Sequence, residues 1–162
     1  MTQSPIFVRV AHAEVTEGEG VLATVGLGSC VAILLYDPVP TVAGMAHVLL
    51  PAPHREFDGL EPAKYATTAV PYLLQEMAAR GARRTRVTAR LVGGASMFGG
   101  ARTSRLAAAG ERNLQAVRDA LDWAGIPVMG EEVGSGHGRS VRLHAADGRV
   151  VVSSYRRADV IL

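Results

Sequence analysis

Short apolar runs rich in β-branched residues recur along most of the chain, separated by Gly, Pro, Asp and Ser. Runs of this length favour strands, because an amphipathic helix would instead space its apolar residues three and four apart. We therefore predict strands at Ile6–Val10, Val21–Val25, Val31–Tyr36, Val42–Leu50, Arg86–Val92 and Ile126–Val133. A last hairpin is predicted from Ser140–His144 to Arg149–Ser154. It turns at Asp147-Gly148, a pair that accepts the positive φ angles of a tight turn.

Two segments show helical spacing instead. The first covers Ala63–Arg80 and ends at Gly81, and Pro71 is predicted to kink it or to divide it into two pieces. The second covers Glu111–Ala124, and Gly125 is placed to end it. Many strands with two main helices predict an α+β fold, a layered mixed β-sandwich with helices packed on it. Neither a repeat nor a linker interrupts the pattern, so we expect a single domain over residues 1–162.

Composition narrows the class of protein. The 162 residues are 48% hydrophobic and 20% charged, an ordinary globular balance, and the net charge of +2 is too small to indicate nucleic acid as a partner. Four arginines, at positions 80, 83, 84 and 86, are interpreted as a solvated helix end and strand start, the alternative being a phosphate-binding patch. No run approaches the length of a membrane span, the start resembles no signal peptide, and one cysteine cannot form an internal disulfide. We therefore expect a cytoplasmic protein without direct membrane insertion.

The single cysteine, Cys30, follows a Gly-x-Gly turn, and His47 lies in the next apolar run. The turn formers Asp37-Pro38-Val39-Pro40 separate the two runs and predict a hairpin. If these four residues form the loop, Tyr36 pairs with Thr41 and Cys30 lies directly opposite His47. Opposed Cβ atoms are about 5 Å apart, which is close enough for a hydrogen bond between thiol and imidazole. A slip of one residue would place the two side chains on opposite faces, so this expectation depends on the loop length.

A cysteine beside a histidine can act as a nucleophile, because the imidazole takes the thiol proton and the resulting imidazolium lowers the thiol pKa. Thr24 can supply the third group that orients the histidine, and the backbone at Gly28, Ser29 and Cys30 can face a developing oxyanion. The alternative is that Cys30 is a small buried hydrophobe and His47 a hydrogen-bonded core histidine. From the residues alone, both interpretations stay open.

The remaining motifs carry less chemistry. The histidines at 12, 54, 137 and 144 lack metal-ligand spacing, and Val31 stands where a dinucleotide-binding loop would need its third glycine. We therefore expect no metal and no organic cofactor. The Gly93–Phe98 loop is either a strand-to-loop turn or a wall of the site. In the second case Ser96, Met97 and Phe98 contact substrate or partner. Arg112 and Asn113, at a predicted helix start, are expected to cap the helix or to make a structural hydrogen bond.

Several of these segments, taken in order, resemble one family. Thr24–Val31 (TVGLGSCV) resembles its nucleophile segment, and Met45-Ala46-His47 with Leu50-Pro51 resembles its histidine segment. Further matches are Lys64-Tyr65-Ala66 at a helix start, Gly93–Phe98 (GGASMF), Gly110–Asn113 (GERN) and Gly138–Val141 (GRSV). By these residues the chain resembles the CheD family, the chemoreceptor glutamine deamidases of bacterial and archaeal chemotaxis.

The resemblance implies a catalytic triad at Cys30, His47 and Thr24, and a fold similar to the catalytic domains of glutamine-deamidating toxins. It implies a protein-glutamine glutaminase that converts specific Gln to Glu on methyl-accepting chemotaxis receptors through a thioester. It further implies hydrolysis of receptor glutamyl methyl esters and binding of a CheC-type phosphatase. The alternative is a non-catalytic adaptor that binds the phosphatase or the receptor.

Overall fold

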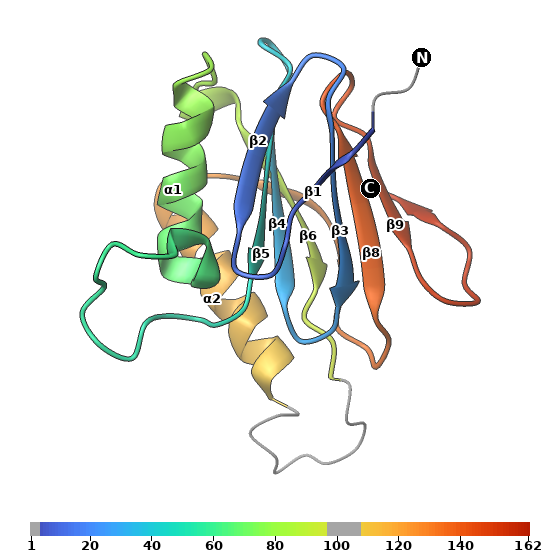
Figure 1. Cartoon of the computed structure of the whole chain (residues 1–162). Helices are drawn as coiled ribbons and strands as arrows, with labels where there is room; N and C mark the ends of the chain where they lie inside the picture. The colour runs from blue at the N-terminus through green and yellow to red at the C-terminus, as the bar shows by residue number, and fades with distance from the viewer. Residues whose placement is uncertain (1–3, 97–107) are drawn as a thin grey trace.

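The structure, a computed structural model, describes residues 4–96 and 108–162. Its strands form two five-stranded sheets (Figure 1). The first sheet consists, in spatial order, of β1 (Ile6–Phe7), β3 (Val21–Leu27), β8 (Arg139–His144), β9 (Val150–Ser153) and β10 (Val160–Ile161). The second consists of β2 (Ala13–Glu17), β5 (Val42–Val48), β4 (Val31–Asp37), β6 (Thr88–Gly93) and β7 (Val128–Val133). The helices are α1 (Ala66–Ala78) and α2 (Ala109–Ala124), with 3-10 turns η1 (Pro62–Lys64) and η2 (Arg84–Arg86).

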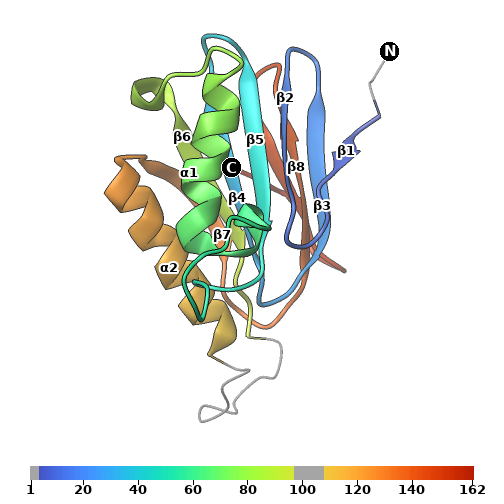
Figure 2. The same cartoon turned by 60° about the vertical axis from the view of Figure 1, so that its left-hand side comes forward.

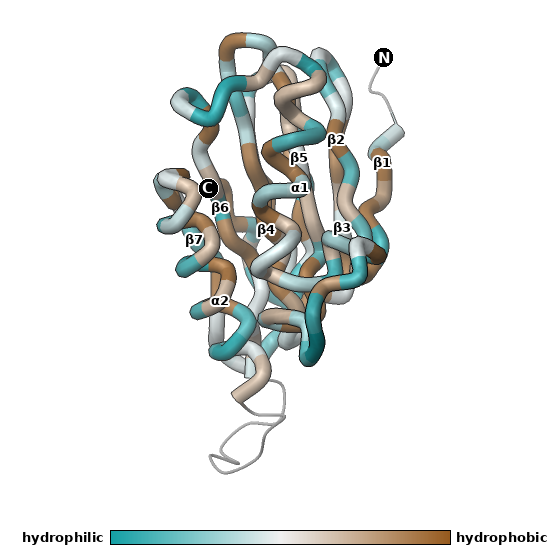
Figure 3. The backbone as a smooth tube through the Cα atoms, turned by 90° about the vertical axis from the view of Figure 1, so that its left-hand side faces the viewer, coloured by the Kyte–Doolittle hydropathy of each residue, from teal (hydrophilic) through white to brown (hydrophobic). Residues whose placement is uncertain are grey.

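The elements form three layers, with the second sheet in the middle. Figure 2 shows α1 and α2 on one side of β4 and β5, and β3 and β8 on the other. All seven residues of β4 are buried, because alternate side chains enter two different cores. Ile33 and Leu35 face the helices, whereas Ala32 and Leu34 face the first sheet. Figure 3 shows hydrophobic residues (brown) along β4 and β6, and alternating hydrophobic and hydrophilic residues (brown and teal) along α2. The predicted α+β fold with two layered sheets and two main helices is confirmed.

Most predicted strands are present, but two observed strands were not predicted. β2 has the sequence Ala-Glu-Val-Thr-Glu, and β10 contains two residues, both exposed. Both lie at the edge of a sheet, where a strand has only one neighbour and one wet face. Such strands need few apolar residues, so the apolar pattern does not reveal them. The hairpin turn at Asp147-Gly148 is confirmed, with Gly148 at a φ of 76°.

The prediction for α2 is confirmed at its C-terminus, where Gly125 caps the helix with a φ of 74°. The prediction for the first helical segment is wrong in where the division falls. The segment divides at Tyr65, whose extended backbone separates η1 from α1, and Pro71 lies inside α1. Pro71 is in the second turn, where it removes the hydrogen bond that residue 71 would donate to the carbonyl of Thr67. The helix tolerates that single loss.

The predicted register of the β4–β5 hairpin is wrong by two residues. Ala32, not Cys30, lies opposite His47, because the loop begins after Asp37 and Asp37 itself pairs with Val42. Asp37 is fully buried, and Arg86 Nε donates to its two carboxylate oxygens at 3.0 and 3.1 Å. The Arg83 amide donates to the same carboxylate at 2.8 Å. This pairing extends the strand through Asp37. Arg86 was expected at a solvated strand start, but it lies in η2 and its side chain binds a buried carboxylate.

Candidate functional site

His47 and Thr24 form a hydrogen-bonded pair that bridges the two sheets. Thr24 lies on β3 of the first sheet, and His47 lies near the end of β5 of the second. Thr24 Oγ1 is 2.8 Å from His47 Nδ1, and the Thr24 hydroxyl donates to the Val8 carbonyl at 2.6 Å. Both side chains are almost fully buried, at 2% and 1% exposure. The predicted proximity of Thr24 and His47 is therefore present.

These two hydrogen bonds together define the tautomer of His47. A hydroxyl has one proton, and the Val8 carbonyl can only accept, so the Thr24 proton points to Val8. Thr24 Oγ1 must then accept a proton from His47 Nδ1. In the neutral imidazole this leaves Nε2 with a lone pair, and Nε2 has no hydrogen-bond partner among the described residues. His47 therefore presents a free basic nitrogen inside the protein.

Cys30 lies diagonally across the hairpin from that histidine, on the same face. The residue opposite Cys30 would be Leu49, two positions beyond His47, because Val31 pairs with Val48. A shift of two residues preserves the side of the sheet, since side chains alternate with a period of two. Consistent with this, Cys30 packs against the core between the two sheets and is partly exposed. Diagonal neighbours of this kind are about 7–8 Å apart at Cα and somewhat closer at Cβ, within reach of longer side chains.

The segment that carries Cys30 is held by hydrogen bonds that its three consecutive carbonyl groups accept from other segments. The Ala95 amide donates to the Gly28 carbonyl at 2.9 Å, and the Gly94 amide donates to the Cys30 carbonyl at 2.8 Å. The Ser29 carbonyl between them accepts a hydrogen bond from Asn113 Nδ2 at 2.9 Å. Gly93 must be a glycine here, because its φ is 112° and a Cβ would overlap the Cys30 carbonyl oxygen. The end of β6 and the glycine-rich loop after it therefore hold the backbone of the cysteine segment in place.

Burial shifts the pKa values of both reactive groups toward their neutral forms. It lowers the pKa of His47 from 6.5 to about 4, because a buried imidazolium loses its hydration. It also raises the pKa of the Cys30 thiol, against a smaller opposing effect of the Cys30 backbone hydrogen bond. Both shifts favour the neutral forms, a thiol and an imidazole, over the ion pair expected from the sequence.

The remaining residues considered for the site are in the glycine-rich loop and at the start of α2. Ser96 follows the glycine loop, and its amide donates to the Ser135 carbonyl at 2.8 Å. Met97 and Phe98 lie outside the described residues. The expected cap at the start of α2 is wrong, because Asn113 lies inside the helix and is buried, but the expected structural hydrogen bond is confirmed. Its contact with the cysteine segment was not predicted. A polar residue on the same stripe as Val117 and Leu121 was the available signal.

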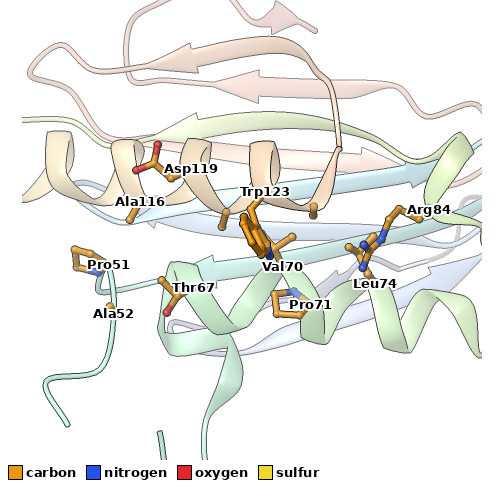
Figure 4. A pocket seen from close by; sticks show the side chains of 12 residues that line it. Pro51, Ala52, Thr67, Val70, Pro71, Leu74, Arg84, Ala116, Asp119 and Trp123 are labelled. Carbon is orange, nitrogen blue, oxygen red and sulfur yellow. The ribbon is translucent and has the colours of Figure 1, made fainter. Parts of the chain in front are cut away.

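A concave surface lies between the two helices, on the side of the second sheet that faces away from Thr24 and His47. Figure 4 shows Trp123 of α2 standing next to Val70 and Pro71 of α1, with Arg84 at one end of the groove. The groove has a volume of about 580 Å³, and Trp123 is 93% exposed beside it. None of the predicted site residues lines it.

Two further findings concern metals and membranes. Within residues 4–96 and 108–162, no three His, Cys, Asp or Glu side chains gather closely enough to hold a metal ion. Neither α1 nor α2, the helices of the described part, is long and apolar enough to cross a bilayer.

The fold has two layered sheets with two helices, Thr24 and His47 are hydrogen-bonded between the sheets, and Cys30 packs against the core between them. The model of the family CheD, described as CheD chemotactic sensory transduction, matches residues 49–154. The chain therefore belongs to the CheD family, which confirms the resemblance seen in the sequence.

Similar proteins come from bacteria and archaea. A probable chemoreceptor glutamine deamidase CheD of Caldanaerobacter subterraneus is 40% identical over 91% of each chain. One named CheD 2 from Geobacter metallireducens is 41% identical over 94% of each chain, and one from Haloarcula marismortui is 39% identical over 99% of this chain and 91% of its own. Among solved structures, the hypothetical protein YfiH of Bacillus licheniformis matches 76% of this chain and 49% of its own, at 16% identity. Its TM-score of 0.40 is too low to carry an argument.

Proposed function

We propose that this protein is a glutamine deamidase that converts specific Gln residues to Glu on methyl-accepting chemotaxis receptors. The observation that carries the proposal is the oriented chain from Val8 through Thr24 to His47, which leaves Nε2 as a free base on the same face as Cys30. The relatives named as probable chemoreceptor glutamine deamidases support the choice of reaction and substrate. In this proposal Cys30, His47 and Thr24 are the catalytic residues.

The reaction begins when Cys30 Sγ attacks the carboxamide carbon of the receptor Gln. His47 Nε2 takes the thiol proton during this attack and then gives it to the departing amino group, which leaves as ammonia. The product is a thioester between Cys30 and the receptor side chain. A water molecule then attacks the thioester carbon, His47 accepts its proton and returns it to the thiolate, and the receptor residue leaves as Glu.

Proton transfer accompanies the attack rather than preceding it. Burial lowers the pKa of His47 and raises the pKa of Cys30, so a resting ion pair is disfavoured. A neutral histidine is the form that a general base needs. Once it becomes an imidazolium, its Nδ1–H hydrogen bond to Thr24 strengthens, because hydrogen bonds from charged donors are stronger than those from neutral ones.

The finer parts of the proposal follow from the same chemistry. An enzyme that forms a thioester from an amide can also form it from a glutamyl methyl ester, which would release methanol. Ser96, with Met97 and Phe98, would contact the substrate or a CheC-type phosphatase, since the loop that begins at Gly93 supports Cys30. We place the protein in the cytoplasm with its receptor substrate, and we expect its fold to be similar to the catalytic domains of glutamine-deamidating toxins.

The experiment is mass spectrometry of cytoplasmic receptor fragments after incubation with the wild type and with Cys30→Ala. Conversion of Gln to Glu by the wild type alone supports the proposal and locates the substrate residues. Cys30→Ser is a second control, because its hydroxyl has the same position but is a much weaker nucleophile. If neither the wild type nor the variants convert any Gln, the deamidase proposal is wrong and the adaptor alternative takes its place. Binding to a CheC-type phosphatase would then be the next measurement.

A further inference from the structure

We infer that Asn113 is a positioning residue that aims the backbone amide of Cys30 at the oxyanion formed in the reaction. The inference rests on the proposed function and adds to it a residue from α2. Asn113 lies far from Cys30 in the sequence, but its side chain contacts the cysteine segment directly (2.9 Å from Nδ2 to the Ser29 carbonyl oxygen).

The amide group of Asn113 has a defined orientation. It lies near two carbonyl oxygens, those of Ser29 at 2.9 Å and Leu49 at 3.1 Å. Carbonyl oxygens only accept, so the nitrogen of the side-chain amide must face both of them. Both protons of Nδ2 are thereby used. Asn113 joins the residue before the proposed nucleophile to the chain just beyond β5, two residues after the proposed base.

The bond to Ser29 controls where the next amide points. The carbonyl of Ser29 and the N–H of Cys30 belong to the same planar trans peptide, so they point in opposite directions. With the carbonyl turned toward α2, the Cys30 N–H is turned away from it. Among the described residues, the Cys30 N–H has its own sulfur as a neighbour and no carbonyl acceptor, whereas the carbonyls of Gly28, Ser29 and Cys30 are all bonded. This amide is thus an oriented donor beside the attacking sulfur.

An amide in that position suits the negatively charged oxygen that develops when the Cys30 sulfur attacks a carbonyl carbon. Fixed donors stabilise such an oxygen in advance of the reaction, and in a serine protease the removal of one such donor lowers kcat by about 100- to 1000-fold. Asn113 itself touches neither substrate nor sulfur in this account. It acts through the peptide plane that it holds, and its burial (2% exposed) keeps water from replacing it.

The test compares two reactions of the same cysteine in three variants. Asn113→Leu and Asn113→Asp keep a similar side-chain shape but lose both donors. Gln115→Leu is the matched control, because Gln115 lies on the same helix, is exposed, and donates to Asp119 on that helix. Deamidation of a receptor fragment passes through an oxyanion, whereas alkylation of Cys30 by iodoacetamide does not. We would measure kcat and KM for the first reaction and the second-order rate for the second.

We expect both Asn113 variants to lose about 100-fold in kcat, as for the loss of an oxyanion donor, with KM within about threefold of the wild type. Their alkylation rates should stay within about threefold, and Gln115→Leu should match the wild type in both reactions. Unchanged kcat in a folded Asn113 variant overturns the inference. So does an equal fall in alkylation and deamidation, or the unfolding of both variants, because either result assigns Asn113 a purely structural role. A wild type without deamidase activity would instead refute the proposed function, which separates the two failures.

Discussion

Replacing Thr24 with Val removes one hydroxyl from the buried pair between the sheets and leaves the side-chain shape nearly unchanged. The hydroxyl makes two hydrogen bonds, to the Val8 carbonyl at 2.6 Å and to His47 Nδ1 at 2.8 Å. After the substitution the Val8 carbonyl and His47 Nδ1, both buried, lose this hydrogen-bond partner. A buried polar group left without a partner costs about 1–3 kcal/mol, so the free energy of unfolding should fall by about 2–6 kcal/mol.

In the proposed mechanism His47 gains a charge during the reaction, and the expected kinetic effect follows from this charge. A hydrogen bond to a charged group contributes about 1.5–3 kcal/mol, and each 1.36 kcal/mol changes a rate tenfold. Loss of the Thr24 bond should therefore lower kcat by about 10- to 150-fold. In addition, without this acceptor the proton of His47 is free to move to Nε2, which removes the base.

The assay is release of ammonia from a receptor fragment, combined with urea unfolding of the same samples. Thr24→Ser is the matched control, because it keeps the hydroxyl and loses only a methyl group, and it should retain kcat within about threefold. A folded Thr24→Val protein with the kcat of the wild type would refute the argument. It would mean that the hydrogen bond seen here neither selects the tautomer of His47 nor stabilises its charged form.

Three further predictions concern stability and exposure. Burial lowers the pKa of His47 from 6.5 to about 4. The unfolded chain therefore binds this proton first, and the free energy of unfolding should fall as the pH drops from 6.5 toward 4. The difference between a pKa of 6.5 and one of about 4 corresponds to a fall of about 3 kcal/mol, and His47→Asn should remove it from urea titrations. Gly93→Ala should destabilise the fold by more than about 2 kcal/mol and lower the activity, because its Cβ would displace the Cys30 carbonyl. Gly18→Ala, also at positive φ but with open space around it, should cost about 1 kcal/mol. Trp123→Ala should change the melting temperature little, and acrylamide should quench Trp123 efficiently, because this only tryptophan is 93% exposed.

The opposite pKa shifts of Cys30 and His47 favour a resting thiol that reacts slowly with alkylating reagents. A neutral thiol reacts slowly with alkylating agents, so labelling of Cys30 should accelerate with rising pH rather than be fast at neutral pH. Substrate binding would then supply the carbonyl that makes proton transfer to His47 productive. This separates the proposed mechanism from one that starts with a thiolate.

Local signals in the sequence determined the elements and the candidate residues. Short apolar runs defined the buried strands, and helical spacing with Gly125 defined the end of α2, because each signal depends only on neighbours along the chain. The family resemblance, carried by ordered motifs, named Thr24, Cys30 and His47. The division of the first helix at Tyr65 and the edge strand β2 did not follow from such signals.

The tertiary structure decided how those residues meet. The hairpin register depends on Asp37. By its residue type Asp37 favours a turn, but hydrogen bonds from Arg86 and the Arg83 amide, in a distant segment, stabilise it in the strand. The error was two residues, and so the candidate pair stayed on one face of the sheet. Two hydrogen bonds form only when the two sheets and a helix pack together: the one from His47 to Thr24 and the one from Asn113 to the Ser29 carbonyl. Contacts between segments far apart in the chain leave no period in the sequence, because each depends on packing geometry rather than on local spacing.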